Sequence, residues 1–331
     1  MGTAIGVNGF GRIGRLTVRS ALERGINVAG INDVADPDRM AHLFKYDSVH
    51  GTYPESVDFS DGTLTIGDQE IEITQKEDPS NLPWNRLGVE VAVESTGLFR
   101  DRESSSKHLE AGAEKVVISA PATNPDLTVV LGVNDDEYAP AQHDIISNAS
   151  CTTNCLSPVA MVLNDEFGIE SGTMTTTHAY TGSQNLLDGP QGKDYRRMRT
   201  AAESMVPTST GAAVATTKVL PELEGKIDGM AVRVPVPDVS LVDFSVVLEQ
   251  SLSKSDLDSV MKEYAEGELE GILDYTEEPL VSVDYMGNPH SSIYDADQSM
   301  IVSDNHAKVI SWYDNEWGYA NRIVDLSQSL L

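Results

Sequence analysis

The chain has 331 residues, of which 40% are hydrophobic, and its 52 acidic residues outnumber 23 basic ones, so the formal net charge is -29 at pH 7. A surface of this sign repels nucleic acids and anionic membranes, and we exclude both as partners. No apolar run reaches the ~18 residues needed to cross a bilayer. Two cysteines are too few for a disulfide framework, and the N-terminus lacks a signal-peptide pattern, so we expect a cytoplasmic protein. Because the acidic residues are spread along the whole chain, we interpret them as an adaptation to high salt.

The first half of the chain alternates predicted strands and helices. Residues 3–8 predict a strand, residues 15–25 a helix that stops at a glycine, and residues 26–33 a second strand. Further apolar stretches predict strands at 90–96, 115–121, 127–133 and 144–150, with a helix over 101–113. Strand–helix–strand units favour a parallel sheet. We therefore expect a doubly wound α/β domain over residues 1–150.

The second half has a different pattern. After a helix at about 151–166, longer alternating strands are predicted at 171–180, 226–236, 239–249, 279–286 and 306–314. Only one further helix, over 253–267, separates them before a closing helix near the C-terminus, and residues 183–200 predict a long ordered loop. This pattern is typical of an α+β domain with a mainly antiparallel sheet, which we expect over residues 151–315.

The first strand and helix are joined by a glycine-rich turn of the form G-x-G-x-x-G. Asp33 ends the next strand, 19 residues after the last of these glycines (33 − 14 = 19). The glycines permit a tight turn and close approach of a pyrophosphate, which the free N–H groups of the helix N-terminus can bind. Asp33 can accept hydrogen bonds from ribose hydroxyls and would repel a 2′-phosphate, so this Rossmann-type fingerprint predicts NAD rather than NADP. The predicted pyrophosphate-binding residues are Gly9, Gly11, Arg12, Ile13 and Gly14.

Both cysteines lie in SNASCTTNCLSP, where a predicted strand passes into a predicted helix. Cys151 and Cys155 are four residues apart on one helix, too far for a disulfide, and no further ligand spacing indicates a metal site. Cys151 falls at the helix N-terminus, where the helix dipole and free N–H groups favour a thiolate. We therefore predict Cys151 as a nucleophile and Cys155 as a less reactive neighbour. His178, at the end of the run TMTTTHAYT, is the leading candidate for its base.

The stretch SNASCTTN resembles the active-site signature of the phosphorylating glyceraldehyde-3-phosphate dehydrogenases. The similarity extends over the whole chain, in order, through NGFGRIGR, KYDSVHG, VESTG, ISAPA, GVND, THAYT, RRMRTAAES, PTSTGAA, KVLPEL, GMAVRVPVP and WYDNEWGY. The resemblance implies an NAD-dependent enzyme of glycolysis and gluconeogenesis that acts as a homotetramer. It also implies that the last helix, residues 316–331, returns to the NAD-binding domain.

The family resemblance also implies site residues. Cys151 would be the nucleophile and His178 the base, and Ser119 and Asn315 would join Arg12, Ile13 and Asp33 in contacting NAD. The attacking inorganic phosphate would be held by Ser150, Thr152, Arg197, Thr210 and Gly211. The phosphate of the substrate would be held by Thr181 and Arg233. No metal is implied, and the loop around 183–200 would lie beside the cofactor of a neighbouring subunit.

Three positions depart from the family pattern. Glu77 stands where a basic residue usually lies near the adenine, so that contact is in doubt. Thr123 replaces a usual lysine, and Gly189 replaces a bulkier residue of strict NAD enzymes, although Pro190 and Val34 remain typical of NAD use.

The implied reaction converts D-glyceraldehyde 3-phosphate and inorganic phosphate to 1,3-bisphosphoglycerate, with reduction of NAD, through a hemithioacetal and a thioester on Cys151. The nearest alternative is erythrose-4-phosphate dehydrogenase, which shares the Cys/His pair. A redox-sensing or regulatory binding protein on the same fold is the alternative from another class. The complete Cys/His pair and phosphate-binding residues favour the enzyme.

Overall fold

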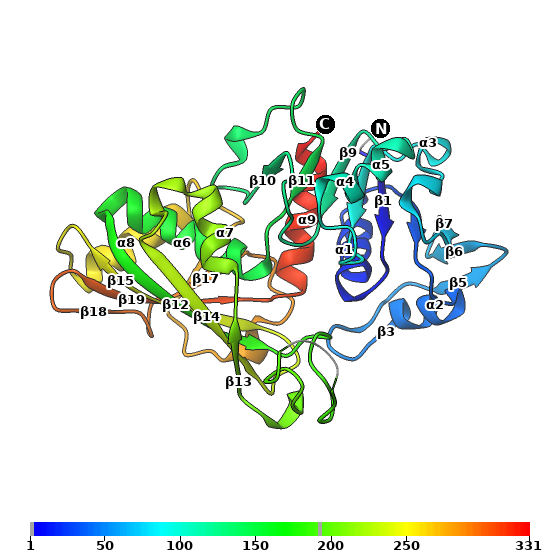
Figure 1. Cartoon of the computed structure of the whole chain (residues 1–331). Helices are drawn as coiled ribbons and strands as arrows, with labels where there is room; N and C mark the ends of the chain where they lie inside the picture. Colours follow the sequence, from blue (N-terminus) through cyan, green and yellow to red (C-terminus); the bar gives the residue numbers. More distant parts are fainter. Residues whose placement is uncertain (1–2, 191–193) are drawn as a thin grey trace. The chain divides into compact units, whose positions relative to one another are not determined.

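The computed structural model describes residues 3–190 and 194–331, which form two compact units (Figure 1). Unit 1 contains the chain up to Val129 together with residues 136–149 and 320–331, and unit 2 contains residues 130–135 and 150–319. In the described ranges no helix is both long and apolar enough to span a membrane.

Unit 1 is built on a nine-stranded sheet with the order β10-β11-β9-β8-β1-β2-β7-β6-β5. All neighbours from β10 to β7 are parallel, and the hairpin strands β5 to β7 are antiparallel. The predicted doubly wound parallel sheet is therefore confirmed. The strands are β1 (Ile5–Asn8), β2 (Val28–Asn32), β5 (Val57–Ser60), β6 (Thr63–Ile66), β7 (Gln69–Thr74), β8 (Val91–Glu94), β9 (Lys115–Ile118), β10 (Leu127–Thr128) and β11 (Ile145–Ser147), with a small separate pair β3 (Tyr46–Asp47) and β4 (Gly51–Thr52).

The central strands β1, β8 and β9 are buried at every position, as expected for a parallel sheet covered on both faces. The helices are α1 (Arg12–Glu23), α2 (Pro37–Lys45), α3 (Trp84–Leu87), α4 (Arg102–Ser105), α5 (Lys107–Glu110) and α9 (Trp317–Ser329). Helix α2 begins where the sequence favours it, since the Asp36 side chain accepts from the N–H of Arg39 and Pro37 needs no N–H partner in the first turn.

Two predicted elements of unit 1 are wrong in detail. The helix expected over 101–113 is split into α4 and α5, and the strand expected over 127–133 extends only over Leu127–Thr128. The hairpin β5–β6–β7 had no counterpart in the predicted elements.

Unit 2 contains a sheet with the order β13-β14-β12-β15-β19-β17-β16, in which β18 also pairs with β19. Most neighbours are antiparallel, and only β12/β14 and β16/β17 are parallel, which confirms the predicted mainly antiparallel sheet. The strands are β12 (Ile169–Ala179), β13 (Val206–Ser209), β14 (Ile227–Val234), β15 (Ser240–Leu248), β16 (Leu273–Thr276), β17 (Ser292–Asp295), β18 (Met300–Val302) and β19 (His306–Tyr313).

Three helices, α6 (Cys151–Phe167), α7 (Ala212–Val219) and α8 (Lys254–Ala265), cover one face of this sheet (Figure 1). Helix α6 contacts β15, β17 and β19, α7 contacts β14, and α8 contacts β16. Strand β15 shows the resulting alternation, with Val242, Phe244 and Val246 buried and the intervening side chains only half-buried. The opposite face of the sheet therefore carries half-buried side chains.

The strand predicted over 279–286 is wrong, because this segment forms a 3₁₀ turn over Ser282–Tyr285. Strands β13, β16, β17 and β18 and helix α7 were not predicted. The described residues of the 183–200 segment contain neither helix nor strand, and residues 191–193 of that predicted loop lie outside the described residues.

Candidate active site

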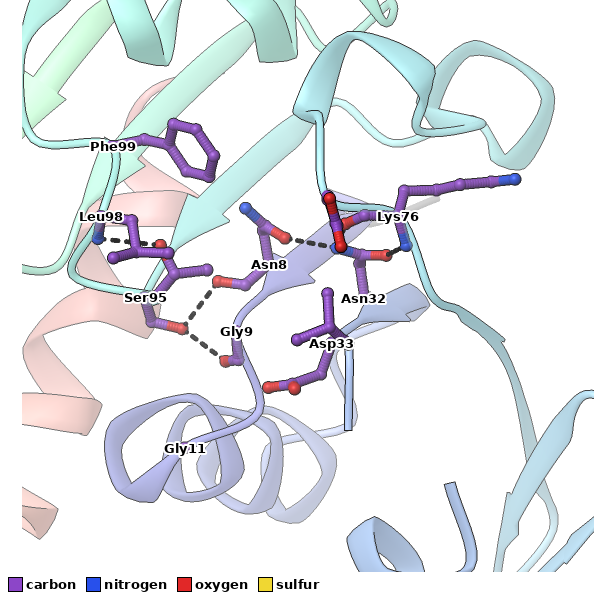
Figure 2. Close-up of a pocket in the computed structure, with 12 residues that line it drawn as sticks. Asn8, Gly9, Gly11, Asn32, Asp33, Lys76, Ser95, Leu98 and Phe99 are labelled. Atoms are coloured by element: carbon purple, nitrogen blue, oxygen red, sulfur yellow. Dashed lines mark hydrogen bonds between the residues drawn. The ribbon is translucent and has the colours of Figure 1, made fainter. Parts of the chain in front are cut away.

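A pocket of about 260 Å³ lies at the carboxyl ends of the parallel strands of unit 1, beside the glycine-rich turn (Figure 2). Gly9 has φ +94°, and a Cβ there would lie 2.5 Å from the N of Thr96, while a Cβ at Gly14 would lie 2.0 Å from the O of Gly9. Gly11 differs, because a Cβ there would meet nothing within 4 Å. Gly9 and Gly14 therefore shape the turn, and Gly11 leaves open space where a pyrophosphate fits.

Asp33 lies in this pocket directly after β2. Its carboxylate accepts from the N–H of Phe10 at 2.7 Å and from the N–H of Ala35 at 2.9 Å. These two bonds hold the carboxylate beside the glycine-rich turn and leave lone pairs for ribose hydroxyls. The geometry fits the dinucleotide that the sequence predicted.

The other predicted contacts of unit 1 lie near the same strand ends. Arg12 and Ile13 form the first turn of α1, and Nη1 of Arg12 donates to the Asp47 carboxylate at 2.6 Å. Burial alone would raise the pKa of Asp47, but the N–H groups of His50 and Val49 and the Arg12 guanidinium lower it to about 2. Arg12 therefore faces a permanent negative charge in this unit.

The pocket wall also includes residues that bear on the doubtful adenine contact. Val34, Lys76 and Glu77 line the pocket, so the departure at Glu77 falls at the site itself. The Ser119 hydroxyl, directly after β9, donates to the carbonyl of Glu94 at 3.0 Å. Asn315 belongs to unit 2 and is not among the pocket residues.

In unit 2, Cys151 is the first residue of α6, with Ser150 as its N-cap. The Sγ of Cys151 lies 3.6 Å from Nε2 of His178, near the end of β12. Nδ1 of His178 lies 2.7 Å from the carbonyl of Ala179. With its proton on Nδ1, a neutral imidazole would donate to that carbonyl and present the Nε2 lone pair to the thiol, which is the form a general base requires. Nη1 of Arg233, which can only donate, lies 2.8 Å from the same Nδ1 and favours the other tautomer.

Burial dominates the protonation of this pair. It raises the pKa of the Cys151 thiol, against the opposing effects of Arg233 and of hydrogen bonds at the start of α6. It also lowers the pKa of His178 to about 3, with the positive charges of Arg233 and Arg197 acting in the same direction. Burial therefore opposes the thiolate that is expected at the helix N-terminus.

Both cysteines are free, and they differ in their surroundings. Cys155 is completely buried, its sulfur lies 3.5 Å from the hydroxyl of Ser292, and burial raises the pKa of its thiol to about 12. Cys151 keeps partial exposure and faces an imidazole. Only Cys151 combines access with a proton acceptor.

Arg233 is next to His178 because the two are register partners on the parallel strands β14 and β12. Its Nη1 lies 2.8 Å from Nδ1 of His178 and donates to the carbonyl of Ala179 at 3.0 Å. Its Nε is buried and has no hydrogen-bond partner among the residues that the structure describes. In a chain with 52 acidic residues, this guanidinium forms no ion pair with any described carboxylate.

The residues predicted to hold inorganic phosphate lie at two helix starts and on one loop of unit 2. The Ser150 hydroxyl accepts from the N–H of Thr153, and the Thr152 hydroxyl is 2.8 Å from that of Tyr313. The Thr210 hydroxyl accepts from the N–H of Ala212 at 3.2 Å, and Gly211 is the N-cap of α7. Thr181, predicted for the substrate phosphate, lies beyond the end of β12 with its hydroxyl 2.9 Å from that of Ser183.

Arg197 lies along β13, where its Nε donates to the Thr208 hydroxyl at 2.9 Å and its Nη2 to the carbonyl of Ser209 at 3.3 Å. The Thr208 hydroxyl donates in turn to Asp194 at 2.8 Å, and Nε of Arg197 is 3.5 Å from the same carboxylate. These contacts use the Nε and Nη2 atoms and leave Nη1 without a partner among the described residues.

Three residues of the site were missed by the sequence reasoning: Asp194, Tyr313 and Ser240. Tyr313 joins Thr152 and Thr176 by its hydroxyl, at 2.8 and 2.9 Å. Ser240 accepts from the N–H of Ala179 at 3.1 Å and donates to Asn315 at 2.6 Å. Because the contacts of Tyr313 and Ser240 join residues 61 to 161 positions apart, local spacing in the sequence carries no signal for them.

A glycine-rich dinucleotide pocket in one unit and a cysteine–imidazole pair in the other define an NAD-dependent dehydrogenase with a cysteine nucleophile as the class that fits. Residues 3–102 match the family model described as the NAD binding domain of glyceraldehyde 3-phosphate dehydrogenase, and residues 150–315 match the model of its C-terminal domain.

Curated relatives cover nearly the whole chain. It is 55% identical over 329 residues to the glyceraldehyde-3-phosphate dehydrogenase of Priestia megaterium, with 99% of this chain and 98% of the relative covered. It is 54% identical to glyceraldehyde-3-phosphate dehydrogenase 1 of Bacillus subtilis, with the same coverage. It is 55% identical to the glyceraldehyde-3-phosphate dehydrogenase of Mycolicibacterium smegmatis, with 97% of this chain and 96% of the relative covered. The chain belongs to the glyceraldehyde-3-phosphate dehydrogenase family, and its cofactor is NAD.

Proposed function

We propose that the chain oxidises D-glyceraldehyde 3-phosphate with NAD and inorganic phosphate to 1,3-bisphosphoglycerate, as its family membership and its residues favour. The observation that carries the proposal is the Cys151 sulfur 3.6 Å from Nε2 of His178, with the half-buried Arg233 beside His178. An aldehyde oxidation that conserves an acyl group needs a nucleophile, a base and a cation for the substrate phosphate, and these three residues supply them.

In the proposed reaction, the sulfur of Cys151 attacks the aldehyde carbon while His178 takes the thiol proton and returns it to the carbonyl oxygen, which gives a hemithioacetal. His178 then takes the hydroxyl proton as a hydride leaves the same carbon, and the product is a thioester on Cys151. The bound NAD supplies the hydride acceptor. An oxygen of inorganic phosphate next attacks the thioester carbonyl, the carbon–sulfur bond breaks, and the acyl phosphate leaves.

The unpaired cation supports the assignment of the substrate phosphate site. Nε of Arg233 has no hydrogen-bond partner, and its guanidinium has no carboxylate partner, among the described residues, so a phosphate dianion satisfies the guanidinium best. We propose that Arg233 and Thr181 bind the substrate phosphate. The cation also lies beside His178, so the same residue orients the substrate against the base.

We propose that the attacking phosphate is held by Ser150, Thr152, Arg197, Thr210 and Gly211. What supports this set is that the N-terminal N–H groups of α7 and the unpartnered Nη1 of Arg197 both favour an anion. We assign Asp194 as the residue that orients Arg197, because it accepts from the Thr208 hydroxyl to which Arg197 donates.

For the cofactor, we propose that Asp33 accepts from the adenosine ribose, that Arg12 and Ile13 bind the pyrophosphate, and that Ser119 and Asn315 contact the nicotinamide half. The open space at Gly11 and the position of Asp33 in the pocket support the first two assignments. We also propose residues 1–150 with the C-terminal helix as the NAD-binding domain and residues 151–315 as the catalytic domain.

The test is the formation of NADH with D-glyceraldehyde 3-phosphate in the presence and absence of inorganic phosphate. The proposal predicts that steady turnover requires phosphate, and that erythrose 4-phosphate is a much poorer substrate. Turnover that is equally fast without phosphate, or a preference for erythrose 4-phosphate, would contradict it.

We also propose that the protein is a cytoplasmic homotetramer. Support comes from four large apolar side chains in and next to the 183–200 segment, Leu186, Leu187, Tyr195 and Met205, which are 73–86% exposed in the single chain. Apolar exposure of this extent favours burial against a partner, and a second copy of this chain is the one we propose. Light scattering coupled to size-exclusion chromatography tests it, and a monomer at micromolar concentration would contradict it.

A salt requirement is the last part of the proposal. With a net charge of -29 per chain, surface carboxylates repel one another, and assembly multiplies the charge. The Debye length falls from ~8 Å at physiological salt to ~3 Å near 1 M, so molar salt removes most of this repulsion. We expect dilution from molar to millimolar KCl to dissociate the tetramer and lower its activity. Full activity and an intact tetramer after prolonged incubation in millimolar salt would show that the acidity has no such role.

A further inference from the structure

We propose that Glu94 is a positioning residue for the NAD pocket, because its carboxylate sets the direction of a hydrogen-bond network that holds both sides of the pocket. Glu94 ends β8, its side chain is completely buried, and it is not among the residues that line the pocket. The inference rests on NAD binding by unit 1 and is independent of the chemistry proposed at Cys151.

Both oxygens of this carboxylate accept hydrogen bonds. Oε2 accepts from Nδ2 of Asn8 at 2.6 Å and lies 3.0 Å from Nε2 of His108. Oε1 accepts from the backbone N–H of Thr96 at 2.8 Å and from the hydroxyl of the same residue. Such a buried carboxylate is fully satisfied by its donors.

The direction of the His108 bond is fixed by Trp84. The indole Nε1 of Trp84 donates to Nδ1 of His108 at 3.0 Å, and an indole N–H can only donate. Nδ1 of His108 must therefore accept, so the ring proton is on Nε2 and points at Glu94. Trp84 and His108 are both completely buried, which leaves water no access to replace either partner.

From Glu94 the network continues to the Lys76 side of the pocket. Oδ1 of Asn8 accepts from Nδ2 of Asn32 at 2.7 Å, and Oδ1 of Asn32 accepts from the backbone N–H of Lys76 at 2.8 Å. Figure 2 shows Asn8, Asn32 and Lys76 along this line at the pocket wall. The network thus crosses the carboxyl ends of β8, β1, β2 and β7, which are neighbours in the sheet.

On the other side of the pocket, Thr96 links Glu94 to the segment after β8. The Thr96 hydroxyl donates to Glu94 and accepts from the N–H of Leu98 at 3.0 Å. Thr96 and Leu98 both line the pocket. One buried carboxylate therefore holds the two walls between which the adenosine half of NAD has to bind.

Only an acceptor at both oxygen positions satisfies these fixed donors. A glutamine at position 94 offers one carbonyl oxygen and one NH₂ group. If the NH₂ group occupies the Oε2 position, it faces the N–H donor of His108. If it occupies the Oε1 position, it faces the backbone N–H donor of Thr96. Either orientation of the amide therefore leaves a buried donor without an acceptor, which is unfavourable in free energy.

The experiment compares Glu94→Gln with a matched control, Glu72→Gln. Glu72 lies on β7 of the same sheet, but its carboxylate binds the exposed Arg86 and takes no part in the network. Calorimetric titration with NAD is expected to show a Kd raised about tenfold or more in Glu94→Gln, with kcat at saturating NAD and the aldehyde KM within about twofold of wild type. The control is expected to match the wild type.

A folded Glu94→Gln with wild-type NAD affinity would overturn the inference, and so would equal losses in kcat and in both KM values. If Glu94→Gln does not fold, NAD binding is compared between His108→Gln and His108→Leu, because glutamine keeps an N–H donor for Glu94 and leucine does not. Weaker NAD binding in the leucine variant alone supports the inference, and equal behaviour of the two overturns it. Wild-type protein that fails to bind NAD would overturn the NAD assignment of unit 1 and the inference with it.

Discussion

The dinucleotide pocket of unit 1 and the cysteine site of unit 2 differ in whether their arginine is paired with a carboxylate. In unit 1 the basic residue at the glycine-rich turn, Arg12, is bound to Asp47. In unit 2 the half-buried Arg233 lies beside the imidazole of His178, and its Nε has no partner among the described residues. The first arrangement neutralises the cation at the glycine-rich turn, whereas the second keeps a cation available for the phosphate dianion that we propose there.

The largest expected effect is a loss of the reaction at Cys151 in unit 2, without a change in NAD binding by unit 1. Cys151→Ser is expected to lower kcat by at least about 10⁴-fold, because a serine hydroxyl is much less acidic and less nucleophilic than a thiol in the same position. NAD binding, measured by calorimetric titration, should stay within about twofold of the wild type.

Cys155→Ser is the matched control, since Cys155 is one helical turn further along α6 and is buried away from His178. It should retain most of the activity. Equal losses in the two variants would show that position at the helix start does not decide which thiol reacts.

The next effect concerns the cation of unit 2. Arg233→Ala should raise the KM for the phosphorylated aldehyde on the order of 100-fold, because it removes the charged partner of a buried phosphate. With unphosphorylated glyceraldehyde, which lacks that phosphate, the penalty should be small. A similar penalty for both aldehydes in steady-state assays would remove Arg233 from the substrate phosphate site.

A smaller effect is expected in the pocket of unit 1. The carboxylate of Asp33 should repel the 2′-phosphate of NADP. Asp33→Gly should therefore lower the ratio of kcat/KM with NAD to kcat/KM with NADP by about tenfold. The measurement is steady-state kinetics with each cofactor at saturating aldehyde and phosphate. A wild type that uses both cofactors equally would leave Asp33 without a selective role.

The smallest expected effect comes from removing the charge of Asp47, the carboxylate that binds Arg12. The pKa of Asp47 is lowered to about 2, so its ionised form stabilises the fold above the ordinary carboxyl pKa, and this stability is lost as the pH falls through about 2. Asp47→Asn should lower the free energy of unfolding at pH 7 by about 1 kcal/mol, a value reduced for the solvent exposure of Arg12. Urea unfolding at several pH values checks this, and a difference from wild type that stayed undiminished between pH 7 and pH 2 would contradict it.

The two units also differ in how far the sequence predicts them. Gly9, Gly11, Gly14 and Asp33 were found by spacing alone, because the turn and the strand that carry them are close in the chain. The proximity of Cys151, His178 and Arg233 depends on the packing of α6 and on the pairing of β12 with β14. The sequence offered His178 as a candidate base for Cys151, but only the family resemblance implied a role for Arg233.

The residues that support the sites were not predicted for the same reason. In the sequence, Glu94 lies near the end of a predicted apolar strand. Its hydrogen-bond partners Asn8 and His108 are 86 and 14 positions away in the chain. Short elements such as β13 and α7 have too few residues to show a period, and the segment 279–286 has the alternation of a strand but forms a 3₁₀ turn.

The most direct test of the account is a rapid-mixing experiment without phosphate. Enzyme, NAD and D-glyceraldehyde 3-phosphate are mixed, NADH is followed by absorbance, and the quenched protein is digested and examined by mass spectrometry. The account predicts a burst of about one NADH per chain, an acyl group on the peptide that contains Cys151, and its discharge when phosphate is added. No burst, or an acyl group on any residue other than Cys151, would contradict the account.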